Sequence, residues 1–142
     1  MDVITVTFNY RLNAFGFLTL NQTADFDANF GFLDQRKAIQ WVSENIEFFG
    51  GDAEKITLIG HSAGAISVAG HMISPQKNIK IANSILISQP FGMAMKTRQE
   101  SLLQYNQFMT VSNCSKIQNP SEAFEVGFKI ISNVFIKILI HF

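Results

Sequence analysis

The chain has 142 residues, of which 47% are hydrophobic and 15% are charged, and its acidic and basic residues cancel to a formal net charge of zero. Without an excess of positive charge, the composition gives no electrostatic basis for binding nucleic acid or an anionic membrane surface. No apolar stretch reaches the roughly 20 residues that a membrane-spanning helix needs, and the single cysteine, Cys114, cannot form a disulfide within the chain.

The chain opens on an apolar run, residues 3–7, in which every residue is β-branched and which ends in Phe8. Branching at Cβ suits a strand, and the lack of polar alternation suits a strand that is covered on both faces. Residues 9–17 contain Gly16 and predict a turn that leads into an irregular loop through Asn29.

From Phe30 the pattern changes to that of an amphipathic helix. Apolar residues recur at spacings of three and four, at Ile39, Val42, Ile46 and Phe49. Charged and polar side chains occupy the other positions, so the period predicts a helix with one buried face. Gly50-Gly51 supplies its C-terminal stop.

Shorter elements follow in alternation. Residues 55–59 and 84–87 predict strands, and residues 63–73 predict a helix that Ser74-Pro75 ends. Strand, helix, strand, helix, strand with short connections implies an α/β protein with crossover helices and a parallel sheet.

The last third of the chain gives weaker signals. Residues 102–111 predict another helix, and Asn119-Pro120-Ser121-Glu122 has the composition of a helix start. Residues 130–142 are almost wholly apolar, with neither a clear period nor turn residues. We assign no element to them.

A serine lies between two glycines where the strand at 55–59 gives way to the helix at 63–73. Gly60-His61-Ser62-Ala63-Gly64 fits the G-x-S-x-G pattern, in which the glycines let strand and helix approach and the serine hydroxyl is exposed on a strained turn. The amide of Ala63 would then point at an oxyanion formed on Ser62. The pattern alone also fits an ordinary strand-to-helix turn, so Ser62 is a candidate nucleophile at this point.

Several ordered motifs resemble those of one family. Residues 9–12 (N-Y-R-L), 16–18 (G-F-L) and 29–35 (N-F-G-F-L-D-Q) resemble the N-Y-R-[LV]-G-x-x-G-F-L and N-x-G-L-L-D-Q patterns of the type-B carboxylesterases. This family includes the cholinesterases and has the α/β-hydrolase fold. The likeness continues through Gly60–Gly64 to about residue 90, and thins after residue 100. We therefore expect a partial carboxylesterase domain at 1–126, best matched over 1–90, and an unmatched apolar tail at 127–142.

The resemblance implies roles for particular residues. Ser62 would be the nucleophile that forms an acyl-enzyme with a small carboxylic ester, and the Ala63 amide would stabilise the oxyanion, with no cofactor required. Most relatives have Glu where this chain has His61, which we interpret as a neighbour of the turn and not as the catalytic base. Arg11 and Asp34 match a structural ion pair of the family.

The resemblance also implies that the chain lacks part of the machinery. In the family the acid and the histidine follow the serine far downstream, and a glycine-rich loop with further oxyanion donors precedes the first strand found here. We expect His71, His141 and Asp52 not to replace them. The chain would then be a truncated and nearly inactive piece of an esterase.

Two alternatives stay open at this stage, a non-catalytic adhesion or binding member of the family and a non-functional gene fragment. No segment resembles a secretory signal peptide, and the localisation is left open.

Overall fold

The computed structural model describes residues 3–19, 29–74, 79–90, 92, 96–111 and 137–141. The chain divides into two compact units, the first made of Met1–Tyr10, Phe32–Met93 and Ile136–Phe142, and the second made of Arg11–Gly31 and Ala94–Phe135. Within the described ranges, no helix combines the length and the apolar character that crossing a membrane demands.

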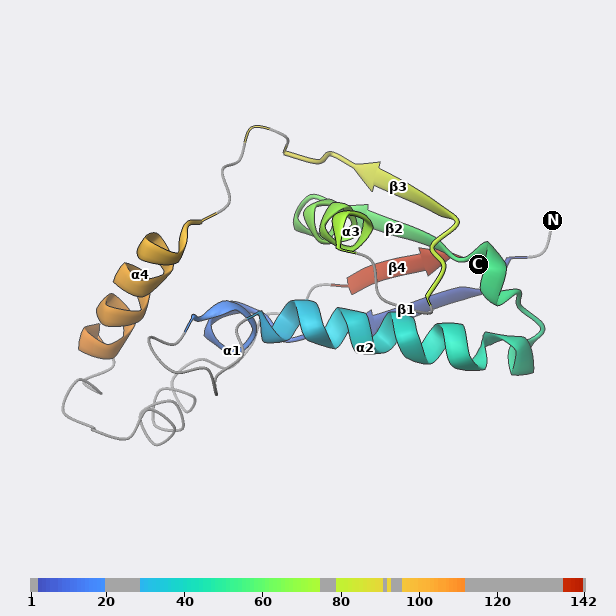
Figure 1. Cartoon of the computed structure of the whole chain (residues 1–142), viewed down its shortest axis with the longest axis horizontal. Helices are drawn as coiled ribbons and strands as arrows, with labels where there is room; N and C mark the ends of the chain where they lie inside the picture. The colour runs from blue at the N-terminus through green and yellow to red at the C-terminus, as the bar shows by residue number, and fades with distance from the viewer. Residues whose placement is uncertain are drawn as a thin grey trace. The chain divides into compact units, whose positions relative to one another are not determined.

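The first unit is built on a four-stranded sheet (Figure 1). Its strands are β1 (Thr5–Asn9), β2 (Thr57–His61), β3 (Asn83–Ile87) and β4 (Lys137–His141), in the order β1-β4-β2-β3. β2 and β3 pair in parallel, as predicted, whereas β4 runs antiparallel to both β1 and β2. The sheet is therefore mixed, because β4 is antiparallel to its neighbours. The sequence analysis did not predict β4, which lies between the two predicted strands β1 and β2.

The strand β2 begins and ends two residues later than predicted. Residues Ala53–Lys55 form a short 3-10 helix, η2, in which Asp52 accepts a hydrogen bond of 2.9 Å from the amide of Glu54. Asp and Asn side chains favour such local turns over strand pairing. The strand consequently starts at Thr57 and runs as far as His61, directly before Ser62.

The long amphipathic helix forms as predicted. α2 (Phe30–Asn45) continues into a 3-10 turn, η1 (Ile46–Phe49), and ends at Gly50. Gly50 adopts the left-handed conformation, with φ 83°, and its amide donates to the carbonyls of Glu47 and Ile46. A residue without Cβ adopts this conformation at little cost, which explains the stop.

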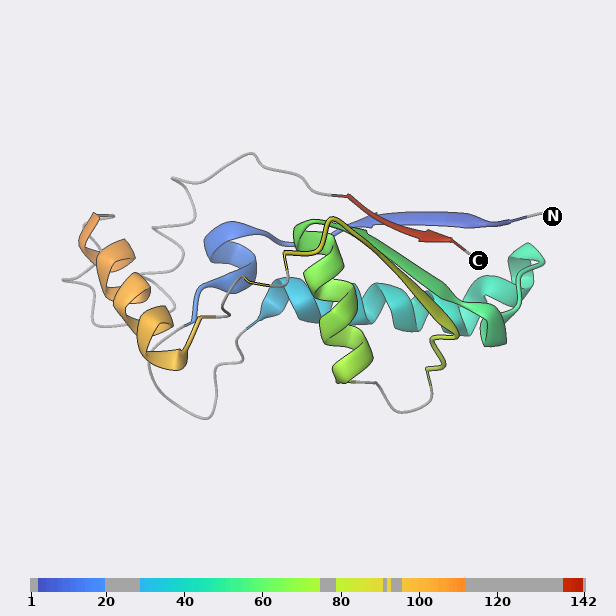
Figure 2. The same ribbon diagram turned by 90° about the horizontal axis from the view of Figure 1, so that it is seen from above.

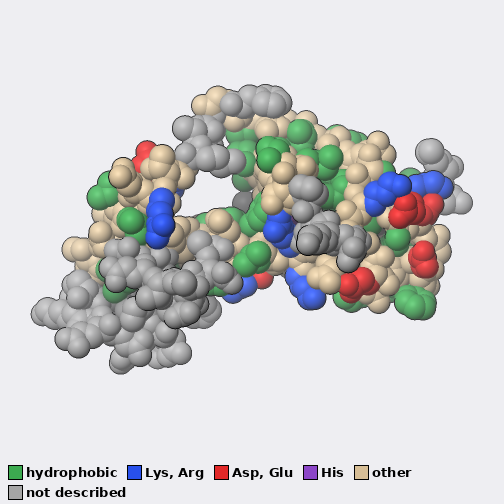
Figure 3. All heavy atoms as spheres, viewed as in Figure 1, with side chains coloured by type: hydrophobic (Ala, Val, Ile, Leu, Met, Phe, Trp, Pro, Cys, Tyr) green, Lys and Arg blue, Asp and Glu red, His purple; other side chains and the backbone are tan. Residues whose placement is uncertain are grey.

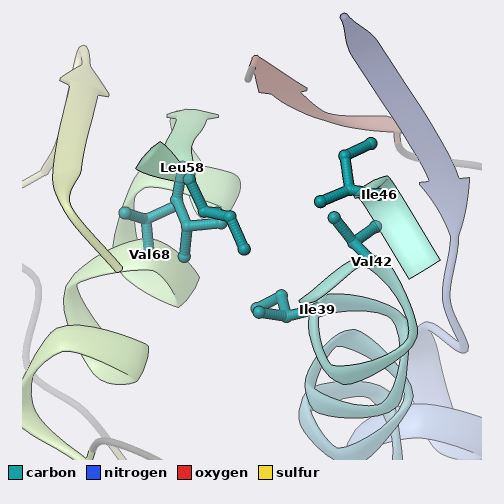
Figure 4. Packing of buried hydrophobic residues seen from close by; sticks show 6 residues of the cluster. Ile39, Val42, Ile46, Leu58 and Val68 are labelled. Atoms are coloured by element: carbon teal, nitrogen blue, oxygen red, sulfur yellow. The ribbon is translucent and has the colours of Figure 1, made fainter. Parts of the chain in front are cut away.

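Helices α2 and α3 (Ala63–Ile73) lie on the same side of the sheet (Figures 1 and 2). Between them and the sheet is one hydrophobic cluster, composed of Ile39, Val42, Ile46, Ile56, Leu58 and Val68 (Figure 4). Ile4, Val6 and Phe8 pack against this cluster from β1 and the residue before it. The burial of these side chains fixes β2 and α3, the two elements that flank Ser62, to the rest of the unit.

The outer surface of this unit is partly charged and partly apolar (Figure 3). Near the start of β2, Lys55 pairs with Asp52 at 3.0 Å and Lys80 with Glu54 at 2.7 Å. These ion pairs are exposed and add little stability. All five residues of β3 are exposed as well, although three of them, Ile85–Ile87, are apolar.

The second unit contains two described helices. α1 (Asn13–Phe17) lies in the stretch expected to be a turn and loop, so that prediction was wrong for these residues: a single helical turn is too short to show a period. α4 (Arg98–Val111) starts four residues before the predicted 102, because Thr97 and Glu100 cap it reciprocally. The helix start predicted at 119–122 lies outside the described residues.

We expect the hydrophobic cluster to dominate stability. Ile46 is 1% exposed and Ile73 is 85% exposed. Ile46→Ala should lower the free energy of unfolding by about 2–5 kcal/mol, whereas Ile73→Ala should change it by less than about 0.5 kcal/mol. Urea unfolding followed by circular dichroism measures both, and equal effects would contradict the assignment of the core.

Candidate active site

Ser62 occupies the single residue between β2 and α3. β2 ends at His61 and α3 begins at Ala63, with Ser62 as the residue that caps the helix. Its backbone has φ 53° and ψ −115°, an angle pair outside the regions that residues with a side chain normally adopt. Such a conformation costs about 1–3 kcal/mol and persists only where the surroundings impose it.

The absence of a side chain at Gly60 lets the chain turn this sharply. A Cβ atom built on Gly60 would lie 2.2 Å from the carbonyl oxygen of Gly64 and 2.7 Å from the amide nitrogen of Ala65. No side chain fits at that distance. The end of β2 can therefore lie against the first turn of α3 only if residue 60 is glycine. Both Gly60 and Gly64 are buried.

Hydrogen bonds hold the strained residue from both sides. The amide of Ser62 donates to the carbonyl of Ile87, at the end of β3, over 2.9 Å. The carbonyl of Ser62 accepts from the amides of Ala65 and Ile66 at 3.0 and 3.2 Å. The conformation of Ser62 is therefore fixed jointly by the neighbouring strand and by the helix that follows.

Ser62 and the residue that follows it are both exposed. Ser62 and Ala63 are exposed, in contrast to the buried glycines on either side. Because Ala63 is the first residue of α3, its amide has no acceptor within the helix and lies at the positive end of the helix dipole. A negatively charged oxygen bonded to Ser62 Oγ would find a hydrogen-bond donor there.

None of the three histidines is placed to serve as a base for Ser62. His71 lies nine residues further along α3, or about 13 Å at 1.5 Å per residue. His141 is opposite Thr57 in the sheet, which is five residues, or about 16 Å, from Ser62 along β2. His61 is the exposed last residue of β2 and adjoins Ser62 in sequence across the tight turn, where it is poorly placed to reach Ser62 Oγ.

The carboxylates singled out in the sequence lie elsewhere. Asp52 precedes β2, where it caps η2, so the length of the strand separates it from Ser62. Asp34 belongs to α2, and the guanidinium of Arg11 lies 5.1 Å from the centre of the Phe30 ring. The ion pair between Arg11 and Asp34 stays a prediction.

A buried polar network, which the sequence analysis missed, connects α2 to the elements around Ser62. Gln35 is fully buried, and its Oε1 lies 2.9 Å from His71 Nε2. Its Nε2 donates to Ser67 Oγ over 3.2 Å, and Ser67 Oγ donates to the carbonyl of Ala63 over 3.2 Å. Tyr10 also bonds Gln35, which lowers the pKa of the phenol, although burial outweighs this and raises the pKa.

His71 is neutral in this environment. Burial and the charge of Arg36 lower its pKa from 6.5 to about 4. Its ring stacks on Phe32 with 3.9 Å between centroids, and Arg36 in turn donates to the carbonyl and the hydroxyl of Ser74. A Gln35 oxygen only accepts hydrogen bonds, so the contact requires the proton on His71 Nε2. The contact between His71 and Gln35 therefore connects α3 to α2.

In the part of the chain that the structure describes, no group of three or more His, Cys, Asp or Glu side chains is arranged to hold an ion. The described residues therefore define an α/β protein whose distinguishing feature is an exposed serine on a sharp turn between a strand and a helix.

Comparison with known proteins identifies the family. The family model described as "Carboxylesterase family" matches residues 1–128. The chain is 51% identical over 86 residues to acetylcholinesterase from Electrophorus electricus, which covers 61% of this chain and 14% of that protein. It is 32% identical over an alignment of 143 positions to acetylcholinesterase from Bungarus fasciatus, covering 92% and 24%, and 48% identical over 97 residues to the "Crystal protein" of Dictyostelium discoideum, covering 68% and 17%.

The chain belongs to the carboxylesterase family. This family implies the α/β-hydrolase fold, with which the helices and the small sheet of the first unit are consistent. The chain spans about 14–24% of the length of the three relatives named above.

Replacement of Gly60 tests how tightly the turn is built. Gly60→Ala should destabilise the protein by about 1–3 kcal/mol or more, because its Cβ would overlap the backbone of Gly64. Gly92→Ala is the matched control, since nothing lies within 4 Å of a Cβ at that position. Thermal unfolding of both variants provides the measurement, and a Gly60→Ala variant as stable as the control would contradict the close approach.

The lowered pKa of His71 predicts acid sensitivity. Between pH 6.5 and pH 4 the unfolded chain binds a proton at this residue and the folded chain does not, so stability should fall as the pH falls through this window, by about 2–3 kcal/mol. His71→Gln should remove this part of the pH dependence and His61→Gln should leave it in place. Urea unfolding at several pH values compares the variants, and an unchanged slope in His71→Gln would refute the assignment.

Proposed function

We propose that Ser62 is the nucleophile of a carboxylic ester hydrolase and that residues 57–73 form the nucleophile elbow of an α/β-hydrolase. One observation carries this proposal: in a carboxylesterase-family chain, an exposed serine has φ 53° and ψ −115° between β2 and α3. An ordinary strand-to-helix turn needs no such strain. The strain has a use if it presents Oγ to a carbonyl carbon, which is the purpose of the turn in G-x-S-x-G hydrolases.

The chemistry is acyl transfer in two steps. Ser62 Oγ attacks the ester carbonyl while a base accepts its proton, and the carbonyl oxygen becomes an oxyanion to which the Ala63 amide donates. The alcohol leaves with a proton, which leaves an acyl group on Ser62. Water then attacks the acyl carbon, and the carboxylic acid is released as the proton returns to Oγ. No step requires a cofactor.

The base for these steps must come from residues other than the three histidines of this chain. His71 and the backbone of His141 lie about 13 Å and about 16 Å from Ser62 along α3 and β2, and His61 adjoins Ser62 across the tight turn. Removing the histidine from a serine protease triad lowers kcat by about 10⁶. We therefore propose that the 142-residue chain alone is nearly inactive, and that a histidine and an acid from outside it complete the site.

The exposed surface of β3 supports the idea of a larger domain. Ile85, Leu86 and Ile87 are 47%, 37% and 46% exposed on one short strand. Adjacent apolar residues exposed on both faces of a strand favour association or aggregation unless further protein covers them. The segment after this strand also carries the Gln89 side-chain oxygen, which is buried and has no hydrogen-bond partner in the structure.

The substrate class follows from the same proposal. We propose small carboxylic esters, by analogy with the relatives that are named acetylcholinesterases. The ion pair between Arg11 and Asp34 is proposed as a structural feature of the same domain. A non-catalytic binding role stays the second candidate in principle, but retention of the serine, both glycines and the strained backbone favours the esterase.

Transfer of the matched segment into an active relative tests the proposal directly. We would replace the corresponding segment of Electrophorus acetylcholinesterase, which aligns over 86 residues, with that of this chain. The chimera should hydrolyse a chromogenic acetate ester and react with a fluorophosphonate probe. Ser62→Ala in the chimera should abolish probe labelling and lower kcat by at least about 10⁵, because no other hydroxyl occupies the turn.

The control variant is Ser101→Ala, made in the 142-residue chain itself and not in the chimera. Ser101 lies on α4 in the second unit. The chain itself, its Ser62→Ala variant and this control should all show the same negligible turnover. Rapid labelling and turnover by the chain alone would refute the claim of inactivity. A chimera that folds like the parent enzyme but remains unlabelled would refute the role of Ser62.

A further inference from the structure

A small cavity lies beside His71 in the first unit. Its volume is about 10 Å³, and its wall is formed by Ile39, His71, Ser74, Ile79 and Ile81. A cavity of this size holds one water molecule where polar groups in its wall can bond that water. The side chains of His71 and Ser74 are the polar groups of this wall.

The ring of His71 supplies a hydrogen-bond acceptor. Its Nε2 carries the proton and donates to Gln35 Oε1 over 2.9 Å, so the other nitrogen, Nδ1, has a free lone pair. Within the described ranges, the bond to Gln35 is the one hydrogen bond of this ring. His71 is only 4% exposed, and a buried acceptor is costly to leave without a donor.

Ser74 supplies a hydrogen-bond donor. Its Oγ accepts from Arg36 Nη2 over 2.6 Å, which leaves the hydroxyl proton available for another acceptor. Ser74 is also exposed, so water can enter the cavity past this residue. A water that accepts from Ser74 Oγ and donates to His71 Nδ1 has the two polar partners that an ordered internal water requires.

We propose that this cavity binds one water molecule, which bridges Ser74 Oγ and His71 Nδ1. With this water in place, hydrogen bonds run without a gap from the residue that caps the C-terminal end of α3 to the first residue of α3, and every donor points in the same direction. The members of this series are, in order, Arg36, Ser74, the water, His71, Gln35, Ser67 and the carbonyl of Ala63. Hydrogen bonds aligned in this way polarise and strengthen one another.

NMR of the unaltered 142-residue chain tests the site. The carbon-bound Hε1 proton of His71 lies between the two ring nitrogens and does not exchange with solvent, so a nuclear Overhauser contact with the water signal places a water next to the ring. We expect this contact in the unaltered chain. Ile81→Phe puts a larger side chain into the cavity and should abolish the contact. Ile73→Phe is the matched control and should leave the contact unchanged, because Ile73 is 85% exposed and does not line the cavity.

A contact that is present in the unaltered chain and in Ile73→Phe but absent in Ile81→Phe supports the bridging water. Absence of the contact in a sample whose His71 ring protons still show contacts with Phe32 would overturn it, since that stacking shows that this part of the chain is folded. Contacts of equal strength in all three proteins would also overturn it, because water would then reach the ring from outside the cavity.

A crystal structure of the unaltered chain gives a measurement that needs no variant. One ordered water should lie about 2.7–3.2 Å from His71 Nδ1 and about 2.5–3.0 Å from Ser74 Oγ. A well-defined cavity wall without such a water would overturn the proposal. Neither measurement depends on the reactivity of Ser62.

Discussion

The contact between the backbone at Gly60 and the carbonyl of Gly64 is the constraint on which the site depends. A Cβ at position 60 would lie 2.2 Å from that carbonyl oxygen, so β2 and α3 approach too closely at this point for any residue but glycine. The one residue between them, Ser62, must then reverse the chain with φ 53°. Its exposure follows from the same geometry, since the buried glycines lie beneath the turn and leave the serine on its outer side.

Two kinds of interaction keep strand and helix in this relation. The hydrophobic cluster, which includes Leu58 from β2 and Val68 from α3, supplies most of the free energy but is not directional. The network around Gln35 is directional: a fully buried amide loses about 1–3 kcal/mol for each hydrogen bond left unmade, so α3 cannot shift along α2 without breaking contacts to His71 and Ser67. Burial sets how strongly the helices associate, and the network sets their register.

The sequence predicted the elements whose signals are local. The period through Ile39, Val42 and Ile46 located α2, and the G-x-S-x-G spacing located the turn at Ser62. Gln35 was missed although it lies four residues before Ile39. Residues at this spacing lie on the same face of a helix, so the pattern placed a polar side chain on the buried face of α2. The T-x-x-E signal at Thr97 also went unused. β4 could not be predicted from the sequence, because an apolar run without a period does not reveal which distant strands it pairs with.

The strained turn and the reactivity of its serine have different structural requirements. The conformation of Ser62 is imposed by neighbours in β2, β3 and α3, which all lie between residues 57 and 87. This backbone conformation costs about 1–3 kcal/mol of folding free energy. The hydrogen bond to Ile87 and the hydrogen bonds of the first turn of α3 can offset that cost. The proposed nucleophilic role of Ser62 would need a base as well, and removal of the histidine from a serine protease triad costs about 10⁶ in rate, or about 8 kcal/mol in the transition state. The contacts that impose the backbone conformation of Ser62 therefore do not by themselves position the further groups that the proposed chemistry needs.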